Sequence, residues 1–231
     1  MSFLTKTFAT LFVSFLCASP AMAQPNFEFA QNPGRLLSKV PLRVDSKARY
    51  LFYLHGRIVE QGRRPTSPQY GIYEYDQILD TFKQNGFVVI SEQRKKGTDV
   101  EQYGRRIAAE VRQLLKAGVP PKQITVVGVS QGSFMTMLAS TYLGNREVNF
   151  VIIAGCSADE GLLKLVNLHG HVLSIYERSD QARSCEKFRT DATGLSEYKE
   201  IELDTNLRHG FIYKPMPEWI DPVVQWAQKS R

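Results

Sequence analysis

A serine between two glycines lies near the middle of the chain, in the segment GVSQG that extends from Gly128 to Gly132. The pattern G-x-S-x-G arises often by chance, because glycine is a frequent residue. Its context is more specific, since apolar residues 124–127 precede it and a helical pattern over 132–143 follows it. A strand, a tight turn and a helix in this order expose a serine hydroxyl on a strained turn. Ser130 is therefore the candidate nucleophile, and an ordinary glycine-rich turn is the alternative.

A serine hydroxyl needs a base to take its proton, and four histidines are available. Functional groups in parallel sheets gather beyond the carboxyl ends of the strands. His169 and His171 precede an apolar segment, so we expect them at the other edge of the sheet. His55 follows a strand but belongs to a His-Gly turn, where a structural role is expected. His209 follows the last expected strand, 198–203, and is the predicted base.

A carboxylate is expected to orient the histidine and to stabilise its charged form. Asp180 comes shortly after the apolar segment 172–176 and is the favoured candidate. Glu177 is nearer to the end of that segment and is the first alternative, followed by Asp159 and Asp204. Aspartates at strand ends often serve only as turn formers. The sequence alone therefore leaves the choice of acid open.

Hydrolysis of an acyl bond also requires backbone N–H groups where negative charge develops. We expect one from Gln131, which follows the nucleophile and begins a helix whose dipole favours an anion. The second is expected from Arg57, after the His-Gly pair that ends the strand 50–54. Gly56 would allow the backbone to approach the substrate closely. The loop 57–73 begins at this turn and is either a wall of the substrate pocket or a solvated surface loop.

Short β-rich segments alternate with helical patterns along the chain. Strands are expected at 50–54, 87–90, 124–127, 150–154, 172–176 and 198–203, and helices at 74–85, 100–117, 132–143, 160–166 and 218–228. Continuous apolar strands that alternate with helices are typical of a parallel sheet covered on both faces. The 231 residues, 43% of them hydrophobic, suit one globular domain.

Together these features resemble the α/β-hydrolase superfamily over nearly the whole chain. The His-Gly turn, the Ser130 elbow, Asp180 and His209 follow the superfamily's order of nucleophile, acid and histidine. The resemblance implies a mainly parallel central sheet with helices on both faces, no large lid, and hydrolysis through an acyl-enzyme without a cofactor. Arg57 stands where lipase-like turns have a second glycine, and Ser133 where a further glycine is frequent. These departures leave the substrate class open.

The N-terminus has the features of a secretory signal peptide. Lys6 supplies a positive charge, a short apolar segment follows, and Ala-Met-Ala at 21–23 fits a cleavage site. Cleavage after Ala23 would leave residues 24–231 as the mature domain, secreted or periplasmic. The apolar segment is too short for an uncleaved membrane anchor, and the mature protein is expected to be soluble.

Two cysteines, Cys156 and Cys185, remain after the loss of Cys17 with the signal segment. An even pair in an oxidising compartment is expected to form a disulfide. Two buried free thiols are the alternative.

The charge distribution and the spacing of possible metal ligands argue against a nucleic-acid site and a metal site. Removal of Lys6 with the signal segment lowers the formal charge from +6 to +5. No basic stripe interleaved with aromatic residues is present, so no nucleic-acid site is expected. The lone His169-x-His171 pair lacks clear further ligands, so no metal site is expected. Small basic clusters are interpreted as solvated surface, at 63–64, 94–96 and 105–106.

Three functions remain. The first is hydrolysis of a carboxylic ester in a small or soluble substrate. The second is hydrolysis of an amide or thioester by the same residues, which leaving-group preference would distinguish. The third is a catalytically silent binding protein of the same fold.

Overall fold

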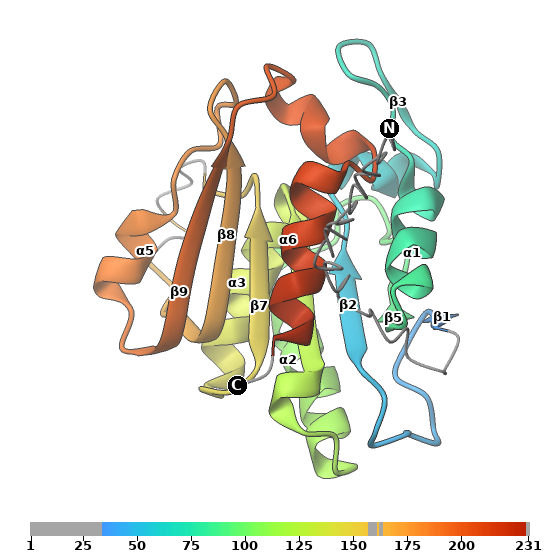
Figure 1. Cartoon of the computed structure of the whole chain (residues 1–231), viewed down its shortest axis with the longest axis vertical. Coiled ribbons are helices and arrows are strands. Elements are labelled where there is room, and N and C mark those ends of the chain that lie inside the picture. Colours follow the sequence, from blue (N-terminus) through green and yellow to red (C-terminus); the bar gives the residue numbers. More distant parts are fainter. Residues whose placement is uncertain (1–33, 157–160, 162–163, 230–231) are drawn as a thin grey trace, which may run out of the picture.

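A sheet of seven strands forms the centre of the protein (Figure 1). The computed structural model describes residues 34–156, 161 and 164–229, so the expected signal segment lies outside the described residues. The strand order is β1-β5-β2-β6-β7-β8-β9, and all neighbouring strands in this sheet are parallel. The strands are β1 (Arg35–Leu37), β2 (Tyr50–Leu54), β5 (Val88–Ile90), β6 (Ile124–Val129), β7 (Asn149–Ile153), β8 (His169–Glu177) and β9 (Gly194–Leu203).

Helices cover both faces of this sheet, as expected (Figure 1). One face carries α1 (Tyr75–Gln84) and α6 (Pro217–Gln228), and the other carries α2 (Val100–Lys116) and α3 (Gln131–Leu143). The short helix α5 (Glu186–Asp191) lies beside the outer strand β9.

Two hydrophobic cores result from the alternation of side chains along the buried strands. In β2, Leu51 and Tyr53 point into the core shared with α1 and α6, whereas Tyr50 and Phe52 point into the core shared with α2 and α3. All five residues of β2 are buried. The sequence of a strand buried on both faces in this way is a continuous run of apolar residues.

Smaller elements lie at the two edges of the sheet where its strands begin and end. Residues 57–73 contain the short 3₁₀-helix η1 (Arg57–Gln61) and a hairpin of β3 (Thr66–Ser67) and β4 (Gly71–Ile72). A second 3₁₀-helix, η3 (Arg208–Tyr213), follows the last strand, and η2 (Pro121–Gln123) precedes β6.

In the part of the chain that the structure describes, no helix combines the length and apolarity needed to traverse a bilayer.

The expected elements coincide with the observed ones to within a few residues, with one correction at β8. This strand begins at His169, so His169 and His171 lie within it rather than before it. A register shift at Gly170/His171 allows the pairing with β9 to continue through these polar residues. Both histidines still lie at the amino end of β8. Of the helix expected at 160–166, residue 161 is helical and residues 164–166 are not, while 160, 162 and 163 lie outside the described residues.

Candidate active site

Ser130 occupies a strained turn between β6 and α3. Its backbone has φ 53° and ψ −120°, in a region that side-chain-bearing residues rarely adopt. Such strain persists only where neighbouring structure holds it in place. Here Ser130 N donates to Ile153 O at 2.9 Å, and Ser133 N donates to Ser130 O at 2.9 Å. The neighbouring strand β7 and the first turn of α3 thus fix the position of the hydroxyl.

The two glycines of the elbow are required by close packing. A Cβ atom at Gly128 would lie 2.2 Å from Gly132 O, and one at Gly132 would lie 1.8 Å from Leu54 O. Neither separation is possible between non-bonded atoms, so any side chain would force α3 away from β6 and β2. These glycines set the distance between Ser130, the candidate nucleophile, and the turn that follows β2.

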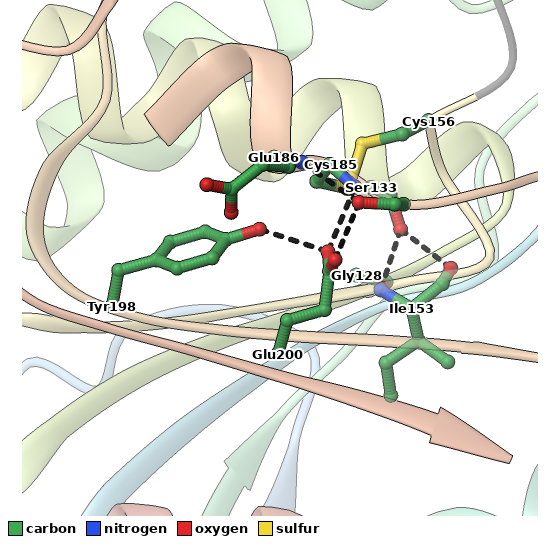
Figure 2. The surroundings of a disulfide bond; sticks show 9 residues. Gly128, Ser133, Ile153, Cys156, Cys185, Glu186, Tyr198 and Glu200 are labelled. Carbon is green, nitrogen blue, oxygen red and sulfur yellow. Dashed lines mark hydrogen bonds between the residues drawn. A yellow bond between two sulfur atoms is a disulfide. The ribbon is translucent and has the colours of Figure 1, made fainter. Parts of the chain in front are cut away.

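Ser133, noted in the sequence as a departure from glycine, has a structural role in this elbow. Its side chain is fully buried, and its Oγ lies 2.7 Å from both Gly128 O and Ile153 O (Figure 2). It also accepts a hydrogen bond from Ile153 N at 3.0 Å. The hydroxyl therefore joins the start of α3 to β6 and β7.

The loop after β9 brings His209 to Ser130. His209 Nδ1 lies 2.7 Å from Asp180 Oδ2, and Nε2 lies 2.9 Å from Ser130 Oγ. An ionised carboxylate only accepts hydrogen bonds, so Nδ1 carries the proton and donates to Asp180. Nε2 is then free to accept from the Ser130 hydroxyl. Asp180 is 4% exposed, and its other oxygen accepts from Gln181 N at 2.7 Å.

Glu177, the first alternative acid, is engaged elsewhere. Its carboxylate accepts from Ser179 N and Oγ at 2.7 and 2.5 Å, and from Thr205 N and Asn206 N at 3.1 Å each. Burial raises the pKa of Glu177, but these hydrogen bonds outweigh it and the net shift is downward. Glu177 thus fixes the loop that leads to His209.

The other carboxylates and histidines considered from the sequence do not join this chain of hydrogen bonds. Asp204 forms an ion pair with Arg178 at 2.6 Å on the surface, and Asp159 lies outside the described residues. His169 and His171 stay at the amino end of β8, and His169 Nδ1 donates to Asn167 O at 2.8 Å.

Two backbone N–H groups in the turns next to Ser130 have no hydrogen-bond partner among the described residues. A Cβ at Gly56 would lie 3.4 Å from Ser130 Cβ, so the turn after β2 packs directly against the nucleophile. Neither Arg57 N nor Gln131 N donates to another residue within the described parts of the chain. These are the groups that the sequence predicts for an oxyanion hole. The side chain of Arg57 is exposed.

His55 is a fixed part of this turn. It is fully buried, its Nδ1 donates to Gly56 O at 2.8 Å, and its Nε2 accepts from Arg94 N at 2.9 Å. Burial, together with the nearby charge of Arg94, lowers the pKa of His55 to about 3. The imidazole therefore stays neutral, as its accepting nitrogen requires.

Arg94 contradicts one interpretation of the sequence. It belongs to the basic cluster 94–96 that was expected to be solvated, yet it is 2% exposed. Lys95 and Lys96 beside it are exposed. Its position in the sequence could have indicated this burial. Arg94 follows β5, a neighbour of β2, at the edge of the sheet where functional groups gather.

The expected disulfide between Cys156 and Cys185 is present, 29 residues apart in sequence (Figure 2). Cys156 also forms an isolated antiparallel bridge with Arg183. The link therefore joins the segment after β7 to the segment that carries Asp180. Glu200 on β9 supports the same segment, accepting from Ser184 Oγ at 2.5 Å and Cys185 N at 2.8 Å.

The hairpin in the loop 57–73 contacts the candidate base. The Tyr70 ring centroid lies 6.3 Å from that of His209, and a Cβ at Gly210 would lie 2.9 Å from Tyr70 Cδ1. Arg63 on this loop forms an ion pair with Asp76. The loop therefore packs beside the imidazole, at the edge where a substrate would approach Ser130.

Comparison with known proteins identifies the fold. No protein-family model matches the chain, and no curated protein matches it. Among solved structures, it is similar to a hyperthermophilic esterase from the archaeon Pyrobaculum calidifontis (TM-score 0.54, 15% identity, covering 80% of this chain and 77% of that one).

Two further structures show the same likeness. One is esterase B from Lactobacillus rhamnosis, solved with a tributyrin phosphonate (TM-score 0.52, 14% identity, 79% and 75% covered). The other is a protein from Butyrivibrio proteoclasticus with bound ferulic acid (TM-score 0.50, 14% identity, 81% and 90% covered). At such identities the likeness is one of fold, and the chain has the α/β-hydrolase fold.

Proposed function

We propose that this protein is a serine hydrolase that cleaves a carboxylic ester through an acyl-enzyme. Ser130 is the nucleophile, His209 the base and Asp180 the acid that orients it. The observation that carries the proposal is the unbroken pair of hydrogen bonds from Ser130 Oγ through both ring nitrogens of His209 to Asp180 Oδ2. An orienting carboxylate, a base and a nucleophile linked in this order are the parts that activate a serine hydroxyl.

In the proposed reaction, His209 Nε2 removes the proton of Ser130 as Oγ attacks the ester carbonyl. The carbonyl oxygen becomes an oxyanion that accepts from Arg57 N and Gln131 N, where one such donor typically contributes about 10²–10³ in rate. The imidazolium, stabilised by Asp180, gives its proton to the departing alcohol oxygen as the carbon–oxygen bond breaks. Water, deprotonated by His209, then releases the acid and restores Ser130.

An ester is favoured over an amide or thioester by the names of similar structures, two of which are esterases. The same residues could attack all three bonds. We expect a small or soluble substrate, since Arg57 in the turn after β2 is exposed, and no cofactor takes part in these steps. The disulfide favours a secreted or periplasmic location.

Steady-state hydrolysis of p-nitrophenyl esters of graded acyl length tests the proposal. Purified wild-type protein is expected to turn over at least one ester, and Ser130→Ala and His209→Ala to lower kcat by on the order of 10³-fold or more. Ser196→Ala, an exposed serine on β9, is the matched control and should retain wild-type rates. Full activity in Ser130→Ala, or no ester hydrolysis by wild-type protein, would overturn the proposal.

A further inference from the structure

A buried cation lies behind the candidate oxyanion hole. Arg94 comes from the segment after β5, and its side chain is fully shielded from solvent. A buried guanidinium must be compensated by a counter-charge and hydrogen-bond acceptors, because desolvation of a charge is costly. The contacts that compensate this charge therefore identify the segments that Arg94 links.

The acceptors of Arg94 lie on both sides of the hole. Its Nη2 donates to His55 O at 2.5 Å and lies 3.2 Å from Gln131 Oε1, while its backbone N donates to His55 Nε2. His55 is two residues before Arg57, and Gln131 directly follows the nucleophile. One side chain thus bridges the two segments that supply the N–H donors.

The counter-charge comes from the helix that begins at Arg57. Glu60 on η1 pairs with Arg94, with Nε 3.6 Å from Oε1, and its side chain is 3% exposed. Glu60 Oε2 also accepts from Gly97 N at 3.1 Å, on the segment that carries Arg94. The Tyr103 ring lies 5.3 Å from the guanidinium carbon. Arg94 is therefore held by the hydrogen bonds of Nη2 and by the charge of Glu60, whereas its Nε and Nη1 have no hydrogen-bond partner in the part of the chain that the structure describes.

The sheet itself does not extend to the hole. The pairing of β2 with β6 ends at Leu54 and Gly128, and among the described residues no ladder hydrogen bond joins the turns that follow these two strands. An oxyanion hole works only when its donors are fixed before charge develops, and a misplacement of about 1 Å can cost on the order of 10²-fold.

We propose that Arg94 is a positioning residue for the oxyanion hole, holding the turn at His55–Arg57 and the first residue of α3 at a fixed separation. The inference rests on the proposed function. Arg94 touches neither the substrate nor the reacting atoms; it acts through the backbone that carries the two donors.

Arg94→Lys keeps the charge but loses the planar group that reaches two acceptors at once. Gln131→Met removes one acceptor at a half-buried position while the backbone N–H remains, so it tests the same contact if Arg94→Lys fails to fold. Arg105→Lys is the matched control, because Arg105 also pairs with a carboxylate, Glu101, and lies 3.8 Å from a tyrosine ring, but is exposed on α2.

Three quantities are measured for each variant. Burst titration with p-nitrophenyl diethyl phosphate counts functional serines, ester kinetics give kcat and KM per titrated site, and an alkyl trifluoromethyl ketone gives the inhibition constant of a tetrahedral adduct. We expect Arg94→Lys to lower kcat per site and to raise the inhibition constant of the ketone by a similar factor, about 10- to 100-fold. KM should stay within about twofold of the wild-type value. Gln131→Met should also lower kcat per site and raise the inhibition constant, each by a smaller factor. Arg105→Lys should change neither kcat per site nor the inhibition constant.

A merely structural role gives a different result. If Arg94→Lys and Gln131→Met reduce only the number of titratable sites or the melting temperature, with kcat per site and ketone affinity unchanged, the inference is wrong. If wild-type protein shows no burst, no ester turnover and no ketone inhibition, the proposed function itself fails.

Discussion

Two acidic side chains three residues apart, Asp180 and Glu177, illustrate how contacts decide roles at the scale of single residues. Both are buried at the carboxyl end of β8. Asp180 accepts from the imidazole of His209, whereas Glu177 accepts from the backbone of the loop before it. In the proposed mechanism Asp180 orients the base His209, and Glu177 holds the loop that carries His209.

This division predicts different defects for two conservative substitutions. Asp180→Asn should lower kcat by on the order of 10³–10⁴-fold with little loss of stability, because an amide cannot stabilise the imidazolium. Glu177→Gln should mainly lower the free energy of unfolding, by about 1–3 kcal/mol, because one oxygen that accepts hydrogen bonds becomes a donor. Ester kinetics and urea unfolding measure both. A folded Glu177→Gln with the larger loss of kcat would reverse the assignment.

His55 predicts a pH dependence of stability. Its pKa is about 3 in the folded protein, against 6.5 for an unperturbed histidine, because burial and Arg94 disfavour the charged form. Between these values the unfolded chain binds a proton that the folded protein does not. The stability from a neutral His55 is thus full above pH 6.5 and is lost on acidification towards pH 3, by up to about 1.4 kcal/mol per pH unit.

Urea unfolding at pH 7, 6, 5 and 4 measures this slope. His55→Gln, which can still donate to Gly56 O and accept from Arg94 N, should show a shallower fall over the same range, because it does not titrate. Parallel curves for the two proteins would contradict the account of His55.

Some of the site residues could be predicted from the sequence and others could not. Ser130 was predicted as the nucleophile because its motif stands between a strand and a helix, and His209 as the base because the other histidines follow no suitable strand or belong to a turn. Asp180 and Glu177 could not be separated, since side-chain direction in an irregular turn is not periodic. Arg94 was misinterpreted because its neighbours Lys95 and Lys96 are solvated, and its burial depends on residues distant in sequence.

At the scale of elements, the link between Cys156 and Cys185 connects the segments after β7 and β8. It closes a loop of 29 residues, for which loop entropy alone predicts a stabilisation of about 3–4 kcal/mol. Cys156→Ser/Cys185→Ser should lose about that much free energy of unfolding in urea experiments. Wild-type protein treated with a reductant should match the double variant. Equal stability of oxidised wild-type and double-variant proteins would contradict this prediction.

Long buried elements were predictable, and of the short elements only the three-residue strand β5 was. The strand at 50–54 and the helices at 74–85 and 100–117 carry enough residues for their periods to be distinct. The three residues of β1, the two-residue strands β3 and β4, and α5 are too short to show a period. They depend on the neighbours against which they pack.

At the scale of the whole molecule, the order of strands and helices was sufficient to predict the architecture. Apolar strands separated by helices leave few arrangements other than a parallel sheet covered on both faces, and the structure confirms it. The substrate could not be predicted in this way, because one fold of this kind serves many reactions.

The mature protein is predicted to begin at Gln24. Small residues at Ala21 and Ala23, after a short apolar segment, form the expected cleavage site. Intact-mass measurement of protein exported by a bacterial host should give the mass of residues 24–231, less two hydrogens for the disulfide. Exported protein that retains residues 1–23 would contradict a cleaved signal.

The most direct test of the account is covalent labelling with a fluorophosphonate, followed by peptide mapping. Such a probe reacts with a serine only when a base activates it and the oxyanion hole receives the phosphoryl oxygen. The account predicts one adduct per protein on the peptide containing Ser130, absent in Ser130→Ala and greatly slowed in His209→Ala. Folded wild-type protein that remains unlabelled, or labelling on another residue that persists in Ser130→Ala, would contradict it.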